Sequence, residues 1–341
     1  EPGIKASSRL SRKLQRMIDV YNSGDDYPLT RNLADEIVAD SGANAYEKSL
    51  AAQLAAQAAY NLDDNAGAAR YLKQVLEFNG LDNDNHFQSL LMLAQLQLQE
   101  EEQINEGIAT LNRYLSETRS QRSEDLALKG QALYQMERFQ EAIPILRQAI
   151  ENSDAPKDVW MRLLMSSYME TDQPERAVVI AEQLASESPS DKAAQLNLVS
   201  AYLQADRMSD AIAALEKLRS TGRLTEENEY QRLYVTYANM DGHDTDVIAV
   251  INEGLSKGVL KPNYQTYLAL AQSYYYSDQI PQAIENWQKA APLSDNGETY
   301  LNLARVLWQE DRIPEARQAA RQALDKGVRN PDDAQRIMNL K

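Results

Sequence analysis

Residues 126–150 read LALKGQALYQMERFQEAIPILRQAI. Apolar and small residues recur there at helical spacing on both sides of a short polar break, which is typical of two amphipathic helices joined by a turn. The same pattern returns at residues 161–185, 195–219, 267–291 and 300–324. Such internal repetition indicates an array of helical pairs in which each pair buries its apolar face against its neighbours.

Each of these units resembles the tetratricopeptide repeat, which is a unit of about 34 residues. That repeat places small residues where two helices approach closely, because a larger side chain would hold the helices apart and leave voids. The matching positions of this chain are Ala56, Ala94, Gly130, Val199, Ala271 and Ala304 in first helices, and Ala68, Gly107, Ala142, Ala177, Ala211, Ala283 and Ala316 in second helices. The pattern departs at Tyr114, Met165, Leu184, Leu218, Tyr234 and Val247, where we expect splayed or shifted helices.

The register of the repeats predicts an all-α fold. Pro174, Pro281 and Pro314 fall at the start of second helices, where the missing N–H costs nothing. Unit starts fall near residues 9, 49, 88, 123, 158, 192, 227, 264 and 297, with longer turns expected early in the chain. The resemblance implies one right-handed superhelical solenoid of about nine units over residues 1–341. It would comprise a divergent pair (1–48), tetratricopeptide-like repeats (49–326) and the start of a capping helix (327–341).

Composition narrows the classes of partner. The 341 residues carry a net charge of −16, which argues against nucleic acid as a general partner because phosphates would be repelled. No apolar run is long enough to cross a bilayer, so we expect membrane contact to be peripheral at most. The chain begins EPGIK without methionine, and we expect a signal peptide to have been removed.

No catalytic or metal-binding constellation is recognisable in the sequence. Cysteine is absent, and the two histidines, His86 and His243, are predicted to be solvated residues of turns. Phosphate-binding glycine loops and hydrolase motifs are absent as well. We therefore predict a protein without enzymatic activity, without a cofactor and without a metal.

Three consecutive tyrosines, residues 274–276, stand out because a helix turns about 100° per residue and cannot direct all three to one core. Tyr274 is predicted to be core, and the other two are predicted to lie on the inner face of the first helix. The corresponding position of successive units is apolar or aromatic: Tyr60, Leu98, Tyr134, Met169, Leu203, Ala238, Tyr275 and Trp308.

This stripe has two interpretations. Its members pack between units, or its exposed members bind a helix or an extended, proline-containing peptide of a partner protein on the concave surface. Arg162 and Arg305 lie one turn earlier and would contact a carboxylate or a main-chain carbonyl. The candidate partner-binding residues are Tyr134, Arg162, Met169, Tyr275, Tyr276, Arg305 and Trp308.

Two segments suggest a narrower group within the tetratricopeptide proteins. DNGETYLNLARVLW (295–308) and ALDKGVRNP (323–331), together with a basic segment near the N-terminus, resemble bacterial envelope tetratricopeptide proteins associated with the TonB energy-transduction system. The resemblance implies a periplasmic adaptor whose partners include energy-transduction components. The alternative is a cell-wall or lipid-associated factor that recognises glycan or anionic lipid, with residues 5–16 as a basic anchor. A cytoplasmic scaffold is the alternative location, and the sequence does not indicate an oligomeric state.

Overall fold

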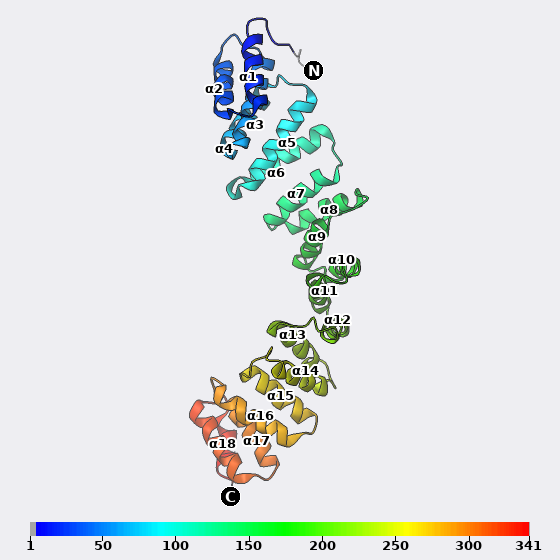
Figure 1. The fold of residues 1–341 in the computed structure, drawn as a ribbon. Coiled ribbons are helices and arrows are strands. Elements are labelled where there is room, and N and C mark those ends of the chain that lie inside the picture. The colour runs from blue at the N-terminus through cyan, green and yellow to red at the C-terminus, as the bar shows by residue number, and fades with distance from the viewer. Residues whose placement is uncertain (1–4, 341) are drawn as a thin grey trace. The chain divides into compact units, whose positions relative to one another are not determined.

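The computed structural model describes residues 5–340, and every regular element among them is helical. Contacts between Cα atoms group the chain into two units, residues 1–180 (unit 1) and 181–341 (unit 2). The division falls inside helix α10 (Pro174–Glu187), which is labelled in Figure 1. The extreme ends of the predicted N-terminal pair and capping segment, residues 1–4 and 341, lie outside the described residues.

Before α10 the elements are α1 (Ser11–Ser23), α2 (Tyr27–Ala39), α3 (Ala45–Asn61), α4 (Asn65–Phe78), α5 (Asn83–Gln99), the 3-10 turn η1 (Glu101–Gln103), α6 (Ile104–Thr118), α7 (Ser123–Gln135), α8 (Phe139–Glu151) and α9 (Asp158–Glu170). After α10 they are α11 (Lys192–Gln204), α12 (Met208–Ser220), α13 (Glu227–Ala238), α14 (Asp244–Ser256), α15 (Tyr264–Tyr276), α16 (Ile280–Ala290), the 3-10 turn η2 (Ala291–Leu293), α17 (Glu298–Gln309), α18 (Ile313–Lys326) and α19 (Pro331–Met338).

Within the described residues, α1 to α18 follow one another as nine helical pairs. The predicted all-α, solenoid-like fold of about nine units is therefore confirmed. From α7 onward each first helix begins within one residue of its predicted start. A single continuous solenoid from residue 1 to 341 stays a prediction, and the predicted start of a capping helix corresponds to α19.

The small positions mark the closest approaches between helices. A Cβ atom added to Gly107 would lie 2.7 Å from Cδ2 of Leu98, and one added to Gly130 would lie 2.6 Å from Cδ2 of Leu146. Either contact is too short for the neighbouring leucine to stay in place. The alanines expected at such positions are fully buried: Ala56, Ala68, Ala94, Ala142, Ala177, Ala211, Ala271, Ala283, Ala304 and Ala316.

The same turn joins the two helices of six pairs. One residue of the turn has a left-handed backbone with φ between 55° and 59°, as in Asp278 and Asp311. The next N–H donates to the carbonyl five residues earlier, at 2.8 Å from Gln279 to Tyr274 and 2.9 Å from Arg312 to Leu307. Aspartate tolerates this conformation better than most residues. The other left-handed residues of this set are Asp63, Glu137, Asp172 and Asp206.

Two first helices begin earlier than predicted. The Asn44 side chain and Glu47 form a capping box at the start of α3, and the Asp82 carboxylate accepts a hydrogen bond of 2.9 Å from the N–H of Asn85 at the start of α5. Part of the expected long turns is therefore helix. The prediction that His86 is a solvated turn residue is wrong, because this earlier start places His86 in α5, where it is 8% exposed.

Each unit is built on apolar cores that several helices share. In unit 1, helices α1 to α5 share one core, with Met17 and Ile37 fully buried. In unit 2, one core joins α11 to α15, and a second joins α15 to α19 and includes Trp287. Because α15 contributes to both cores of unit 2, its position is fixed on two sides, which holds the tyrosines at its end in place.

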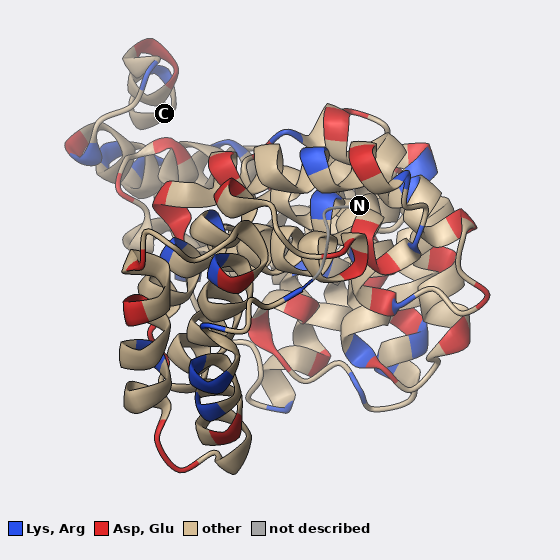
Figure 2. Ribbon diagram, turned by 90° about the horizontal axis from the view of Figure 1, so that it is seen from above, with Lys and Arg blue, Asp and Glu red and all other residues tan. Residues whose placement is uncertain are grey.

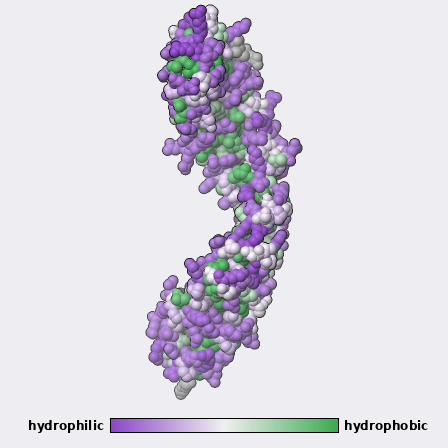
Figure 3. Space-filling view, in the orientation of Figure 1, coloured by the Kyte–Doolittle hydropathy of each residue, from purple (hydrophilic) through white to green (hydrophobic). Residues whose placement is uncertain are grey.

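Charged residues of both signs are interspersed along the helices (Figure 2). One partly buried group in unit 2 joins three helices: Arg219 lies 2.9 Å from Glu216 and 2.6 Å from Glu253. The Arg219 guanidinium and further hydrogen bonds from Lys257 and Tyr230 lower the pKa of Glu253 to about 2. Hydrophobic residues reach the visible surface as small separated patches among hydrophilic ones (Figure 3).

Candidate functional site: an aromatic hollow in unit 2

Helices α15, α16 and α17 enclose a surface hollow of about 230 Å³ in unit 2. We call it the aromatic hollow. Its lining consists of Gln272, Tyr275, Tyr276, Trp287, Asn302, Arg305, Val306 and Gln309. Two tyrosine rings and an indole supply apolar surface, three carboxamides supply donors and acceptors, and one guanidinium supplies positive charge. Apolar surface combined with placed polar groups is typical of a binding site.

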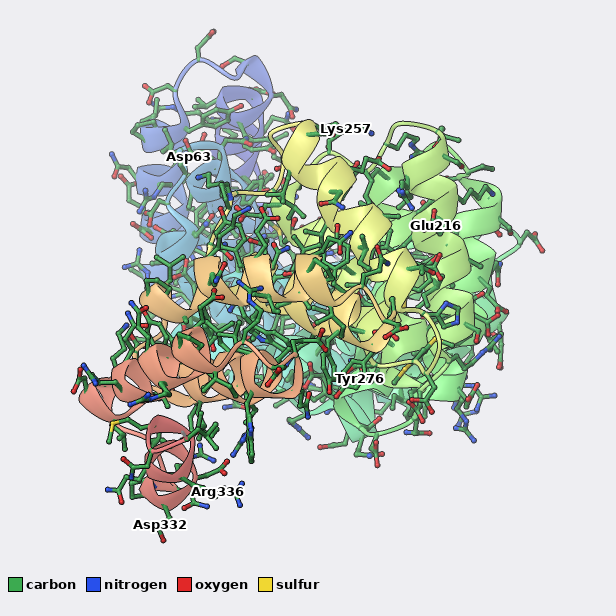
Figure 4. All side chains as sticks on the ribbon, turned by 90° about the horizontal axis from the view of Figure 1, so that it is seen from below. Asp63, Glu216, Lys257, Tyr276, Asp332 and Arg336 are labelled. Carbon is green, nitrogen blue, oxygen red and sulfur yellow. The ribbon has the colours of Figure 1, made fainter. Side chains whose placement is uncertain are left out.

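The three tyrosines have three different environments. The Tyr274 ring packs against both cores of unit 2, and its hydroxyl accepts a hydrogen bond of 3.2 Å from Asn252. The Tyr275 ring is half-buried with its centroid 5.6 Å from that of Trp287, and its hydroxyl lies 3.3 Å from Oε1 of Gln309. Tyr276, labelled in Figure 4, is 74% exposed, and its ring lies edge-to-face with that of Tyr275, with 5.6 Å between the two centroids. The edge-to-face pair therefore leaves the Tyr276 ring largely in solvent.

Arg305 forms one wall of the hollow, with its guanidinium held from the far side by α19. Its Nε donates to the Asp333 carboxylate at 2.7 Å, and Nη1 donates to Oδ1 of Asn302 at 3.0 Å. The structure thus brings Arg305 to the same hollow as Tyr275 and Tyr276, but the ion pair with Asp333 already neutralises part of the Arg305 charge. What remains for a ligand is a polarised edge, which suits a main-chain carbonyl better than a second carboxylate.

Trp308 is absent from the lining of the hollow. Its half-buried ring packs against the core of α15 to α19, and the guanidinium of Arg336 on α19 lies 5.3 Å from the ring centroid. Figure 4 shows Arg336 on this last helix. The structure places Trp308 beside the hollow, under α19, and not in one patch with Tyr275 and Tyr276.

Trp287 is the site residue that sequence reasoning missed. It forms the floor of the hollow from α16, is 5% exposed, and its indole N–H finds no hydrogen-bond acceptor among residues 5–340. A signal existed, because Trp287 follows the buried Ala283 by one helical turn and so faces the same side of α16. A large ring at that position fills the gap between two first helices and supports Tyr275.

The remaining predicted site residues belong to unit 1. The Tyr134 hydroxyl lies 2.9 Å from Oγ of Ser166, and its ring meets Phe139 edge-on at 5.3 Å. Arg162 and Met169 are half-buried on α9. The stripe to which Tyr134 and Met169 belong is mixed: Leu98 is 9% exposed, whereas Tyr60 is 48% exposed.

The basic N-terminal segment is partly neutralised. Arg9 forms an ion pair of 2.9 Å with Asp40, and Lys13 forms one of 2.6 Å with Glu36. Hydrogen bonds from Arg9 and from the N–H of Gly42 lower the pKa of Asp40 to about 2. These contacts dock α1 on α2 and leave less free charge for an acidic surface. None of the helices that the structure describes is long and apolar enough to span a membrane.

Neither histidine belongs to a metal cluster. Nδ1 of His243 lies 2.8 Å from the carboxylate of Asp246, and His86 is buried beside Phe87. Over residues 5–340 no three metal-binding side chains gather in one place.

Tetratricopeptide-repeat family models match three segments of the chain, residues 126–155, 168–234 and 268–335. With the paired helices and the buried small positions, these matches confirm that the chain contains tetratricopeptide repeats. Proteins built from such repeats generally mediate protein–protein interactions, typically as non-catalytic scaffolds that bind on extended surfaces of the array.

Solved structures with a similar fold include a tetratricopeptide repeat protein from Parabacteroides merdae ATCC 43184. It is 14% identical with a TM-score of 0.44, and the alignment covers 77% of this chain and 98% of that one. Another is the MamA protein, at 21% identity and a TM-score of 0.44, with 51% of this chain and 94% of that one covered. No match was found among curated proteins.

Proposed function

We propose that this protein is a non-enzymatic adaptor that binds a peptide or helix of a partner protein at the aromatic hollow. The observation that carries the proposal is Tyr276, a large aromatic side chain that is 74% exposed and rests on Tyr275 over the floor formed by Trp287. An exposed aromatic ring on a rigid support loses little entropy on binding, which is why such residues dominate interface energetics.

The hollow accommodates one apolar or aromatic side chain of the partner. The carboxamides of Gln272, Asn302 and Gln309 surround it and match the polar main-chain groups on either side of such a side chain. The positive edge of Arg305 favours a carbonyl. These features suit an extended segment or an exposed helix end better than a small charged metabolite.

We place this adaptor in the periplasm, in a system for TonB-dependent envelope transport, with energy-transduction components among its partners. The support is the resemblance of residues 295–308 and 323–331 to envelope proteins of that system. The first of these segments lies in and just before α17, which forms a wall of the aromatic hollow, and the second leads into α19, which holds Arg305. The resembling segments therefore surround the proposed site.

Site-specific photo-crosslinking tests the partner and the place together. A photoreactive phenylalanine analogue at position 276 keeps an aromatic ring there, and one at Leu293, which is 53% exposed in the same unit, serves as the matched control. In living cells we expect adducts from position 276 that include inner-membrane energy-transduction proteins, and none of these from position 293. Identical adducts from both positions would contradict a specific site.

The affinity of the identified partner provides the quantitative test. Tyr276→Ala should weaken binding about tenfold or more, as truncation of an interface hot spot does. Leu293→Ala should leave the affinity unchanged. Recovery of the protein in the cytosol, where an intact inner membrane protects it from added protease, would overturn the periplasmic assignment. The binding site would remain testable.

A further inference from the structure

Unit 1 carries a second surface of different chemistry on its first helices. One hollow of about 330 Å³ lies between α3 and α5, and another of about 450 Å³ lies between α5 and α7. Gln95 and Gln99 line both hollows, so the two hollows adjoin on one surface and share these side chains as a wall. We call this surface the glutamine strip after five of its lining residues, Gln88, Gln95, Gln99, Gln131 and Gln135.

Helical spacing aligns these glutamines. Gln95 and Gln99 are four residues apart on α5, and Gln131 and Gln135 are four residues apart on α7, so each pair lies on one face of its helix. All five glutamines of the strip are exposed, and the glutamine side chains that form hydrogen bonds within residues 5–340, such as Gln53, Gln97 and Gln148, are different ones. Each carboxamide therefore presents two open donor hydrogens and an open acceptor oxygen.

The strip is uncharged in a strongly acidic protein. A quarter of all residues are charged, with 51 acidic and 35 basic side chains, yet no acidic or basic side chain lines either hollow. Its floor is aliphatic, with Leu91, Leu98 and Leu128 between the amides. A charged ligand would lose hydration there without gaining an opposite charge, so the strip selects an uncharged one.

We propose that the glutamine strip binds an extended, uncharged segment of a partner protein through that segment's main chain. A carboxamide has the same donor and acceptor groups as a peptide bond, and an extended backbone leaves its own groups open for pairing. Helices in contact lie roughly 8–10 Å apart. A segment that crosses from α3 to α7 at roughly 3.3 Å per residue is therefore about six residues long. Its small apolar side chains meet the leucine floor.

The lining favours a peptide over a glycan. Sugar rings are commonly held by stacking on aromatic faces, and Tyr60 is the one aromatic residue among those that line the two hollows. The leucines between the glutamines match the alternating side chains of an extended peptide. The inference is independent of the aromatic hollow, because every residue of the strip belongs to unit 1.

The test begins with selection of random peptides of about eight residues on the full chain, followed by synthesis and fluorescence anisotropy of the peptides selected. We expect uncharged sequences, weakened when alternate peptide nitrogens are methylated, because methylation removes main-chain donors. The double variant Gln95→Ala/Gln131→Ala should weaken binding about tenfold, as loss of two modest hydrogen bonds does. Tyr276→Ala should leave it unchanged, which separates this surface from the proposed function.

The matched control is Gln140→Ala/Gln318→Ala, which removes two exposed glutamines on the second helices α8 and α18. All four positions are on the surface, so circular dichroism should report the same fold for each variant. Predominantly charged selected peptides, or equal loss in the control, would overturn the proposal. Binding of a chitin hexasaccharide that the Gln95/Gln131 variant abolishes would assign the strip to glycans instead.

Discussion

On a helix, a step of one residue changes the environment of a side chain, as it does for Tyr274, Tyr275 and Tyr276. The first ring is shared by two cores, the second is half-buried on Trp287, and the third is in solvent. Helical geometry alone predicted that they separate. It did not predict the support under Tyr275, because that support comes from Trp287 on a different helix.

The burial of His86 predicts that the stability of the fold depends on pH. Burial, with a smaller contribution from Arg113, lowers the pKa of His86 below its ordinary value, so the folded protein keeps it neutral while the unfolded chain binds a proton near pH 6.5. The unfolded state then binds more protons, and stability is lost as the pH falls below about 6.5, with a slope of up to about 1.4 kcal/mol per pH unit. Urea unfolding between pH 7.5 and 5 measures this.

Replacing this histidine isolates its contribution. His86→Phe keeps a ring beside Phe87 and should flatten the dependence in that window, because phenylalanine does not titrate. His243→Asn, which changes the other histidine of the chain, should retain it. An unchanged slope in the His86→Phe variant would mean that other groups produce the effect.

At the scale of the element, α19 is held by burial and by one carboxylate. Ala334 and Ile337 are fully buried, and Asp333 joins Arg305 at 2.6 Å and Arg336 at 2.8 Å. Asp333→Ala should destabilise the docking of α19 by about 1 kcal/mol, since two partly exposed ion pairs are lost. Hydrogen exchange of α19 should accelerate, and Arg305 should become free to bind a carboxylate.

The neighbouring aspartate supplies the comparison. Asp332, labelled in Figure 4, is exposed on the same helix. Asp332 and Asp333 both lie in the first turn, where a negative charge stabilises the N-terminus of a helix. Asp332→Ala therefore removes a charge from that turn without removing either ion pair, and exchange should change much less. Equal acceleration in both variants would attribute the stability of α19 to the helix terminus and not to Arg305.

Much of this element structure could be predicted from sequence. Prolines and small residues are local signals, and they gave the starts of the later helices and the close contacts at Gly107 and Gly130. The early starts of α3 and α5 depend on side-chain caps at Asn44 and Asp82. The prediction followed the repeat register and therefore placed both starts too late.

The candidate site was less accessible to prediction. Tyr275, Tyr276 and Arg305 were identified because they lie on the inner positions of first helices. Trp287 and the cover that Arg336 places over Trp308 depend on contacts between elements, and repeat spacing does not encode these contacts. The uncharged lining of the glutamine strip likewise emerges only when three helices are assembled.

For the whole molecule, each helical pair depends on its neighbours, so damage should remain local. Leu111 on α6 and Leu215 on α12 are both fully buried, and each truncation to alanine should cost about 2–5 kcal/mol. Hydrogen exchange should accelerate around α5 and α6 in Leu111→Ala, and around α11 to α13 in Leu215→Ala. Uniform acceleration from α1 to α19 in either variant would mean that the chain unfolds as one cooperative body.

The shared turn has a consequence for how such a chain changes over evolution. Its closing contact, as from Gln279 to Tyr274, joins two main-chain groups, and its one demanding position takes Asp or Glu. A duplicated or deleted helical pair therefore includes its own turn and leaves the turns of other pairs intact. The number of helical pairs can increase or decrease by whole pairs, while the surface residues of each pair diverge toward new partners.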